Sequence, residues 1–173
     1  MNFSPAIQML YDEHQIILQA IAQVLTLLDS NSPNRISRLR WYVNFFRMYG
    51  DKYHHQKEED ILFQFLQKDA SPLTNFVDAL TEHHELFRNY LKEIDDNLLK
   101  NDIDSASRLF KQYLSDLRDH ISAEDDEFFI TVESHYGEAE KENLYYLFLD
   151  QDRALGVNQK QEFEKQIKLN NEA

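Results

Sequence analysis

Residues 53–63 read YHHQKEEDILF, and residues 119–129 read DHISAEDDEFF. In each stretch a His is followed four residues later by a Glu, then by two further acidic residues, and by a Phe nine residues after the His. Side chains four residues apart project from one face of an α-helix, about one turn apart. Each of the two pairs, His54 with Glu58 and His120 with Glu124, can therefore bind one ion. The two stretches therefore predict two metal-binding helices.

A shorter pattern precedes each stretch. Glu13-His14 and Glu82-His83 are Glu-His pairs, each followed by apolar residues three and four positions after the His. The chain therefore contains an internal repeat. Each unit is a Glu-His pair followed by one of the longer stretches, and each unit spans two helices. We therefore expect two helical hairpins of one design, paired with each other.

Helical periodicity extends beyond these motifs. The 173 residues include only three Gly and three Pro, which favours long helices over a many-stranded sheet. A Ser-Pro pair is typical of a helix start, so Ser32-Pro33 and Ser71-Pro72 divide the first hundred residues into three helices. A fourth segment follows the polar stretch 97–104 and ends near Tyr136-Gly137. Apolar residues at helical spacing run along the four segments: Ile7, Leu10, Ile17, Ile21, Val24 and Leu28; Leu39, Val43, Phe46, Ile61 and Phe65; Phe76, Leu80, Phe87, Leu91 and Ile94; Leu109, Phe110, Tyr113, Leu117, Ile121 and Phe128.

These segments predict an all-α protein, an up-and-down four-helix bundle with a C-terminal helical extension. The bundle is expected over residues 1–136. The extension, packed on the bundle or trailing from it, is expected over residues 137–173. Within it, one helix is expected over about residues 138–149 and a shorter polar one over about residues 158–169, with Gly156 between them.

Composition excludes several classes of function. The chain has no Cys, which rules out disulfides, thiolate metal sites and cysteine nucleophiles. A formal net charge of −13 is unsuited to nucleic acid or to an anionic membrane surface. The first residues lack a basic start followed by an apolar stretch, and no run approaches the roughly twenty apolar residues of a membrane span. We therefore expect a soluble, cytoplasmic protein that binds neither nucleic acid nor membrane.

The candidate ligands occupy positions that should be buried. His54 and His120 fall on the apolar stripes of their helices, and His14 and His83 hold the matching positions of the first and third helices. Polar groups there cost several kcal/mol if left unpaired, and a bound cation would satisfy them together. His55 and His84 point about 100° around the helix from their neighbours, so a flank or surface position is expected for both. The predicted metal ligands are His14, His54, Glu58, His83, His120 and Glu124.

Six ligands are too many for one four-coordinate structural zinc. If Glu58 and Glu124 both bridge, each of two metals receives two His nitrogens and two carboxylate oxygens, and one or two positions per metal stay open. Open positions on a redox-active metal suit dioxygen, peroxide or nitric oxide, or a bridging oxide or hydroxide. Iron is the leading candidate, although affinity alone also admits zinc, manganese or copper. Hydrogen bonds to other acidic side chains could orient the ligand imidazoles. The candidates are Glu59, Asp60, Asp125 and Asp126, with a solvated acidic face as the alternative.

Over about residues 5–135 the chain resembles the hemerythrin-like family, also called the cation-binding HHE family. The shared pattern is EH on the first and third helices with HxxxE on the second and fourth. The resemblance implies a di-iron centre bridged by Glu58 and Glu124. Oxygen-carrying hemerythrins have a fifth His one turn before the third-helix His, where this chain has Ala79, so reversible oxygen carriage is not implied. The remaining four His and two Glu are similar to the branch linked to nitric-oxide and oxidative stress, iron-centre repair and iron or oxygen sensing.

Three functions fit these patterns. The first is a non-haem di-iron protein that binds or reduces dioxygen, peroxide or nitric oxide in stress response or iron handling, with no catalytic residue besides the ligands. The second is a metal- or redox-dependent sensing or interaction module without turnover, read by a partner through the C-terminal extension. The third is a structural bundle stabilised by zinc or mixed metals. The sequence identifies no protein or redox partner.

Overall fold

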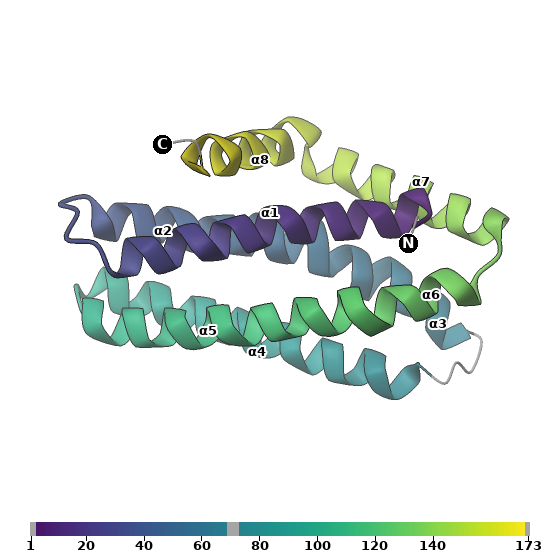
Figure 1. Ribbon diagram of the computed structural model, residues 1–173, viewed down its shortest axis with the longest axis horizontal. Coiled ribbons are helices and arrows are strands. Elements are labelled where there is room, and N and C mark those ends of the chain that lie inside the picture. Colours follow the sequence, from purple (N-terminus) through teal and green to yellow (C-terminus); the bar gives the residue numbers. More distant parts are fainter. Residues whose placement is uncertain (1–2, 69–72, 172–173) are drawn as a thin grey trace.

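The computed structural model of the chain describes residues 3–68 and 73–171, and every regular element within them is a helix. Four bundle helices lie side by side along the long axis, and α7 and α8 lie across one face (Figure 1). The predicted all-α bundle is confirmed for the described part of the chain. The first bundle helix is α1 (Pro5–Leu28); the second joins α2 (Arg35–Phe45), η1 (Phe46–His55), η2 (Glu58–Leu62) and α3 (Phe63–Lys68); the third is α4 (Thr74–Leu99); the fourth joins α5 (Ile103–Ala123), η3 (Glu124–Phe128) and α6 (Phe129–His135); α7 (Glu138–Leu155) and α8 (Val157–Asn171) follow.

The core of the bundle contains two apolar clusters. One includes Ile21, Val43 and Phe110, and the other includes Leu10 and Phe129 toward the opposite end of the bundle. Along each bundle helix, the buried side chains between the two clusters are polar or charged, apart from Tyr53 on the second. These side chains form one polar layer across an otherwise apolar core, and burying such a layer is costly unless its groups are paired.

Three segments beside this layer, η1, η2 and η3, are π-helical. In a π-helix each N–H donates to the carbonyl five residues back, and such wide turns occur frequently at functional sites. The N–H of Phe63 donates to the carbonyl of Glu58, and the N–H of Phe129 donates to the carbonyl of Glu124. The sequence did not predict these wide turns, because the apolar spacing was interpreted with α-helical geometry.

The second bundle helix begins later than Ser32-Pro33 predicted. The N–H of Arg35 donates to the carbonyl of Ser32 over 3.0 Å, which closes a turn, and α2 begins at Arg35. Pro33 therefore lies in a turn instead of the first helical turn. Ser71-Pro72, the predicted start of the third helix, lies outside the described residues.

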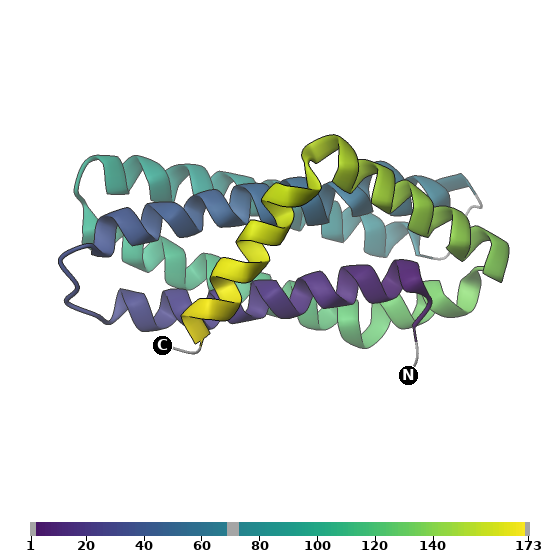
Figure 2. The same cartoon turned by 90° about the horizontal axis from the view of Figure 1, so that it is seen from above.

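The C-terminal extension forms two helices joined at Gly156. α7 begins at Glu138 as predicted but runs to Leu155, beyond the predicted end at residue 149. Gly156 has a φ of 105°, which L side chains rarely adopt and which separates the two helical axes. Both helices contact α1 and η1, and α8 crosses obliquely over the bundle (Figure 2). No helix within the described ranges is long and apolar enough to cross a membrane.

Candidate metal centre

The first group of possible ligands lies between α1 and the second and fourth bundle helices. His14, His54, Glu58 and Glu124 each offer a ligand atom, and these atoms all lie within 4.8 Å of one another. His14 Nε2 is 3.3 Å from Glu124 Oε2, and His54 Nε2 is 3.8 Å from Glu58 Oε1. All four residues are 0 % exposed. The group therefore presents two nitrogens and two carboxylates in a space closed to solvent.

The second group lies beside the first and shares its carboxylates. Glu58, His84, His120 and Glu124 again bring one ligand atom each within 4.8 Å of the others. His84 Nε2 is 3.1 Å from His120 Nε2, and His120 Nε2 is 3.2 Å from Glu124 Oε2. His84 Nε2 is 3.6 Å from Glu58 Oε2. Because Glu58 and Glu124 belong to both groups, the geometry is that of two adjacent cation sites with two shared carboxylates.

Six buried polar atoms of these groups lack hydrogen-bond partners among the described residues. The Nε2 atoms of His14 and His54 and both carboxylate oxygens of Glu58 and Glu124 are buried without a hydrogen bond to any described residue. An unpaired buried polar group costs about 1–3 kcal/mol, and more when it is charged. A cation in each group would satisfy these atoms together. Nitrogen and carboxylate donors suit iron, zinc, manganese or copper, so the residues present fit a two-metal centre.

On the third bundle helix, the structure brings His84 into the donor groups in place of the predicted His83. His84 is 0 % exposed, whereas His83 is exposed and belongs to neither group. The buried stripe of α4 explains the difference, because His84 lies four residues after Leu80 and three before Phe87, both buried. His83 lies one position off that stripe, about 100° around the helix. The apolar spacing of this helix could be recognised in the sequence, but the repeated Glu-His pair favoured His83 as the ligand.

Each imidazole of the two groups is held from outside through its Nδ1 atom. His14 Nδ1 is 2.7 Å from Asp125 Oδ1, and His54 Nδ1 is 3.0 Å from Glu13 Oε2. His84 Nδ1 is 2.7 Å from Glu59 Oε1. A carboxylate only accepts, so these three Nδ1 atoms each carry a proton, and Nε2 is the ring nitrogen that faces the donor group. His120 Nδ1 instead lies 3.3 Å from His83 Nδ1.

The four predicted orienting acids divide into two pairs. Glu59 and Asp125 contact ligand imidazoles, whereas Asp60 and Asp126 are exposed. Glu13 was not predicted, although it is 2 % exposed and holds His54. Its position directly before His14 in the Glu-His pair was the available signal.

Burial and neighbouring charges shift the pKa values of the candidate ligands strongly. Burial, with the neighbouring charge of His14, lowers the pKa of His54 to about 3. Burial also lowers the pKa of His120 to about 3, despite the nearby Glu124. Both imidazoles are therefore neutral near pH 7, the form that binds metal.

His14 and Glu58 behave in the opposite way. Burial disfavours the charged form of His14, but the hydrogen bond to Asp125 and the adjacent Glu124 carboxylate outweigh it and raise the pKa of His14 to about 9. Burial and the adjacent Glu124 carboxylate raise the pKa of Glu58 well above its ordinary value. Burial also opposes ionisation of Glu124, but His120 and His14 outweigh it and lower the pKa of Glu124 to about 2. At neutral pH the protonated His14 thus offsets carboxylate charge in the metal-free centre.

His55 lies beside the second group without completing it. It is 3 % exposed, which corrects the expected flank or surface position, and with His84 and His120 it makes a third group whose possible ligand atoms lie within 4.8 Å of one another. The His55 ring stacks on the His84 ring, with centroids 3.9 Å apart and planes 11° apart. Parallel stacked rings direct their in-plane lone pairs alongside each other, so both cannot point at one metal in this arrangement. His55 therefore serves as packing for His84 in this geometry.

Comparison with known proteins bears on this centre. No curated protein sequence matches the chain. The family model described as the hemerythrin HHE cation-binding domain matches residues 6–131. That range contains both ligand groups and ends before α7. The chain, with its buried His and Glu groups suited to a metal, belongs to the hemerythrin HHE cation-binding domain family.

Proposed function

We propose that the chain holds two metals, iron in the first place, and binds or reduces small oxygen or nitrogen species at them. The proposed ligands are His14, His54, Glu58, His84, His120 and Glu124, with Glu58 and Glu124 shared between the metals. The observation that carries the proposal is the pair of overlapping donor groups, in which six buried atoms lack hydrogen-bond partners among the described residues. Stress response or iron handling is the setting that the four-imidazole, two-carboxylate set suggests.

Two nitrogens and two carboxylates leave one or two positions open on each metal. Bound iron would supply electron exchange and a Lewis acid at those positions. The surroundings restrict what can enter, because Phe129 stacks on His14 and Phe63 stacks on His84, with centroids 5.3 Å and 6.0 Å apart. Rings packed against the ligands favour dioxygen, peroxide or nitric oxide over larger substrates.

A sensing module without turnover is the second candidate. The observation that favours it is a direct contact between the metal centre and the C-terminal helices, since Lys160 of α8 pairs with Glu13, which holds His54. A change at the metal could therefore reach the surface of α8. Multiple turnover of peroxide or nitric oxide would support the first candidate, whereas binding without turnover would support the second.

The test compares metal content in variants of two adjacent histidines. Protein from iron-supplemented medium is expected to hold two irons per chain, and His83→Ala is expected to retain both because His83 lies outside the donor groups. His84→Ala should lose the metal of the second group, and Glu124→Ala should lose both. Metal analysis and visible spectra before and after addition of nitric oxide provide the measurement.

Three outcomes would contradict the proposal. Wild-type protein without metal would leave a plain helical bundle. Zinc bound in place of iron, without a response to nitric oxide, would favour the structural alternative. Equal metal content in His83→Ala and His84→Ala would contradict the ligand assignment.

A further inference from the structure

Four charged side chains from four different elements form a buried cluster beside the metal centre. Glu13 comes from α1, Lys57 from the second bundle helix, Asp152 from α7 and Lys160 from α8, and their exposed fractions are 2 %, 0 %, 6 % and 8 %. Lys57 Nζ lies 2.5 Å from Glu13 Oε1 and 2.6 Å from Asp152 Oδ1. Lys160 Nζ pairs with Glu13 Oε1 as well, and lies 2.5 Å from Asp152 Oδ2. The cluster contains two acids and two bases.

Glu13 connects this cluster to a proposed ligand. Its Oε2 accepts the hydrogen bond of His54 Nδ1, while its Oε1 faces both ammonium groups. One carboxylate group therefore separates Lys160 from His54. The orientation of the His54 ring depends on Glu13, and that of Glu13 depends on Lys57 and Lys160.

Glu13 and Lys160 each stabilise the charged form of the other. Burial alone raises the pKa of Glu13, but the Lys57 ammonium and the hydrogen bond from His54 outweigh it and hold the pKa well below its usual range. Burial alone lowers the pKa of Lys160, but Glu13 and Asp152 outweigh it and raise the pKa. Removing one partner of a buried pair leaves an uncompensated charge, whereas the complete set fixes geometry.

α8 is held in place over this cluster by several contacts. The hydroxyl of Tyr53 donates at the junction of α7 and α8, 3.0 Å from the carbonyl of Leu155 and 2.9 Å from that of Gly156. The hydroxyl of Tyr49 donates to Glu164 Oε1 over 2.9 Å. Ile167 is 0 % exposed in the main core cluster. α8 is therefore a packed helix that brings Lys160 to Glu13.

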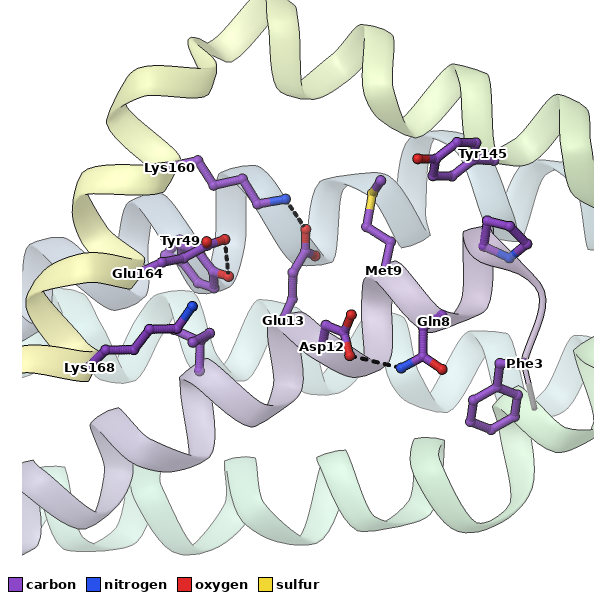
Figure 3. A pocket seen from close by; sticks show the side chains of 12 residues that line it. Phe3, Gln8, Met9, Asp12, Glu13, Tyr49, Tyr145, Lys160, Glu164 and Lys168 are labelled. Atoms are coloured by element: carbon purple, nitrogen blue, oxygen red, sulfur yellow. Dashed lines mark hydrogen bonds and ion pairs between the residues drawn. The ribbon is translucent and has the colours of Figure 1, made fainter. Parts of the chain in front are cut away.

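A cavity of about 690 Å³ opens between α1, α7 and α8. Glu13 and Lys160 line it, and Figure 3 shows Lys160 reaching across to Glu13 at its wall. Because this ion pair faces the cavity, a loosened α8 would admit water to Glu13 before any bundle helix moved. The second ligand group is not covered by α8 in this way, because the residue that faces His120 Nδ1 is the exposed His83.

We propose that Lys160 is a positioning residue for the metal held by His14 and His54, and that α8 is therefore part of the metal centre. The inference rests on the proposed function. It goes beyond the family match, which ends at residue 131, because Lys160 and Asp152 lie outside the matched range. Loss of Lys160 should weaken one metal and spare the other.

The test follows release of Fe(II) to a strong chelator under anaerobic conditions, using the full chain. His54→Ala and His84→Ala, which each remove a ligand from one metal, assign the two phases of release. Lys160→Met should accelerate the His54-side phase about tenfold, the lower end of the effect expected for a lost partner of a ligand, and leave the other phase unchanged. Lys168→Met is the matched control, since Lys168 lines the same cavity without an ion pair to Glu13.

A second variant and a spectroscopic readout separate positioning from folding. Asp152→Asn/Lys160→Met removes an acid and a base together, so the buried net charge is unchanged, and it should show the same selective acceleration. Mössbauer spectra of the iron-loaded Lys160→Met protein should show one of two iron signals shifted. Release at wild-type rates in both variants, or equal acceleration of both phases, would overturn the inference. Wild-type protein that holds no metal would instead contradict the proposed function.

Discussion

At the scale of single residues, protons and metals compete for the same atoms. His14, with its pKa raised to about 9, carries a proton on both ring nitrogens in the metal-free centre at neutral pH, and burial beside Glu124 raises the pKa of Glu58. A metal needs the His14 Nε2 lone pair and an ionised Glu58. Metal binding therefore has to displace the Nε2 proton of His14.

We expect Fe(II) binding to release one proton from His14 near pH 7, because its pKa is raised to about 9. Affinity should rise between pH 6 and pH 8, because both pH values lie below the His14 pKa and each released proton adds about one logarithmic unit of affinity per pH unit. Anaerobic calorimetry in buffers of different ionisation enthalpy measures the release. Affinity independent of pH over this range would contradict the assigned protonation.

Some residues of the candidate metal centre could be predicted from the sequence, and others could not. The HxxxE spacing and the apolar stripes predicted His54, Glu58, His120 and Glu124, and the structure brings them together with His14. His83 was favoured over His84 because a local dipeptide repeat does not specify helical rotation, whereas the buried stripe of α4 does. Glu13 could not be predicted as a partner of His54, because that contact joins residues far apart in the chain.

At the scale of elements, the junction between α7 and α8 is the most sensitive position. Gly156 has a φ of 105°, and a side chain in the left-handed region costs roughly 1–2 kcal/mol. Gly156→Ala should therefore lower the Tm by about 2–8 °C, taking about 2–4 °C per kcal/mol for a chain of this size. Thermal unfolding followed by circular dichroism checks this.

Gly50→Ala is the matched control for this prediction. A Cβ at Gly50 would lie 3.9 Å from Phe46 Cδ1, an ordinary contact, within a helical segment. The substitution should leave the Tm unchanged or raise it, since Gly inside a helix costs about 0.5–1 kcal/mol relative to Ala. Equal losses of Tm in the two variants would contradict the assigned strain at Gly156.

Element boundaries were predicted unevenly. Glu138 as the start of α7 followed from the Gly137 before it, and α8 begins one residue before the predicted 158. The predicted end of α7 at residue 149 was too early, since the helix continues through Asp152, which is buried against Lys57 and Lys160. Ser32-Pro33 gave the wrong start because a Ser-Pro pair suits a turn as well as a first helical turn.

At the scale of the whole molecule, the polar layer divides the core and weakens it when the metals are absent. Ligands that bind only the folded state stabilise it by about 2.7 kcal/mol at a hundredfold excess over Kd. Fe(II) should therefore raise the Tm by about 5–11 °C at that excess, and a chelator should reverse the change. Thermal unfolding with and without metal measures it.

Glu124→Ala serves as the control at this scale, because Glu124 belongs to both ligand groups. Its Tm should not respond to Fe(II). A wild-type Tm indifferent to both metal and chelator would show that metal binding and folding are not linked. The bundle itself was predictable from helical periodicity, but the burial of Lys57 and Lys160 was not, since it depends on how α8 crosses α1.

The wide turns have a consequence for how the length of this chain can vary. A π turn carries one residue more than an α turn of the same register, so a deletion within residues 60–62 or 126–128, beyond the proposed ligands, can close as α-helix without rotating the apolar residues that follow. A deletion in α1 or α4 instead rotates everything beyond it by about 100°. In an alignment of relatives we therefore expect single-residue gaps to fall in η2 and η3, and Glu13-His14 and His84 to stand in ungapped blocks.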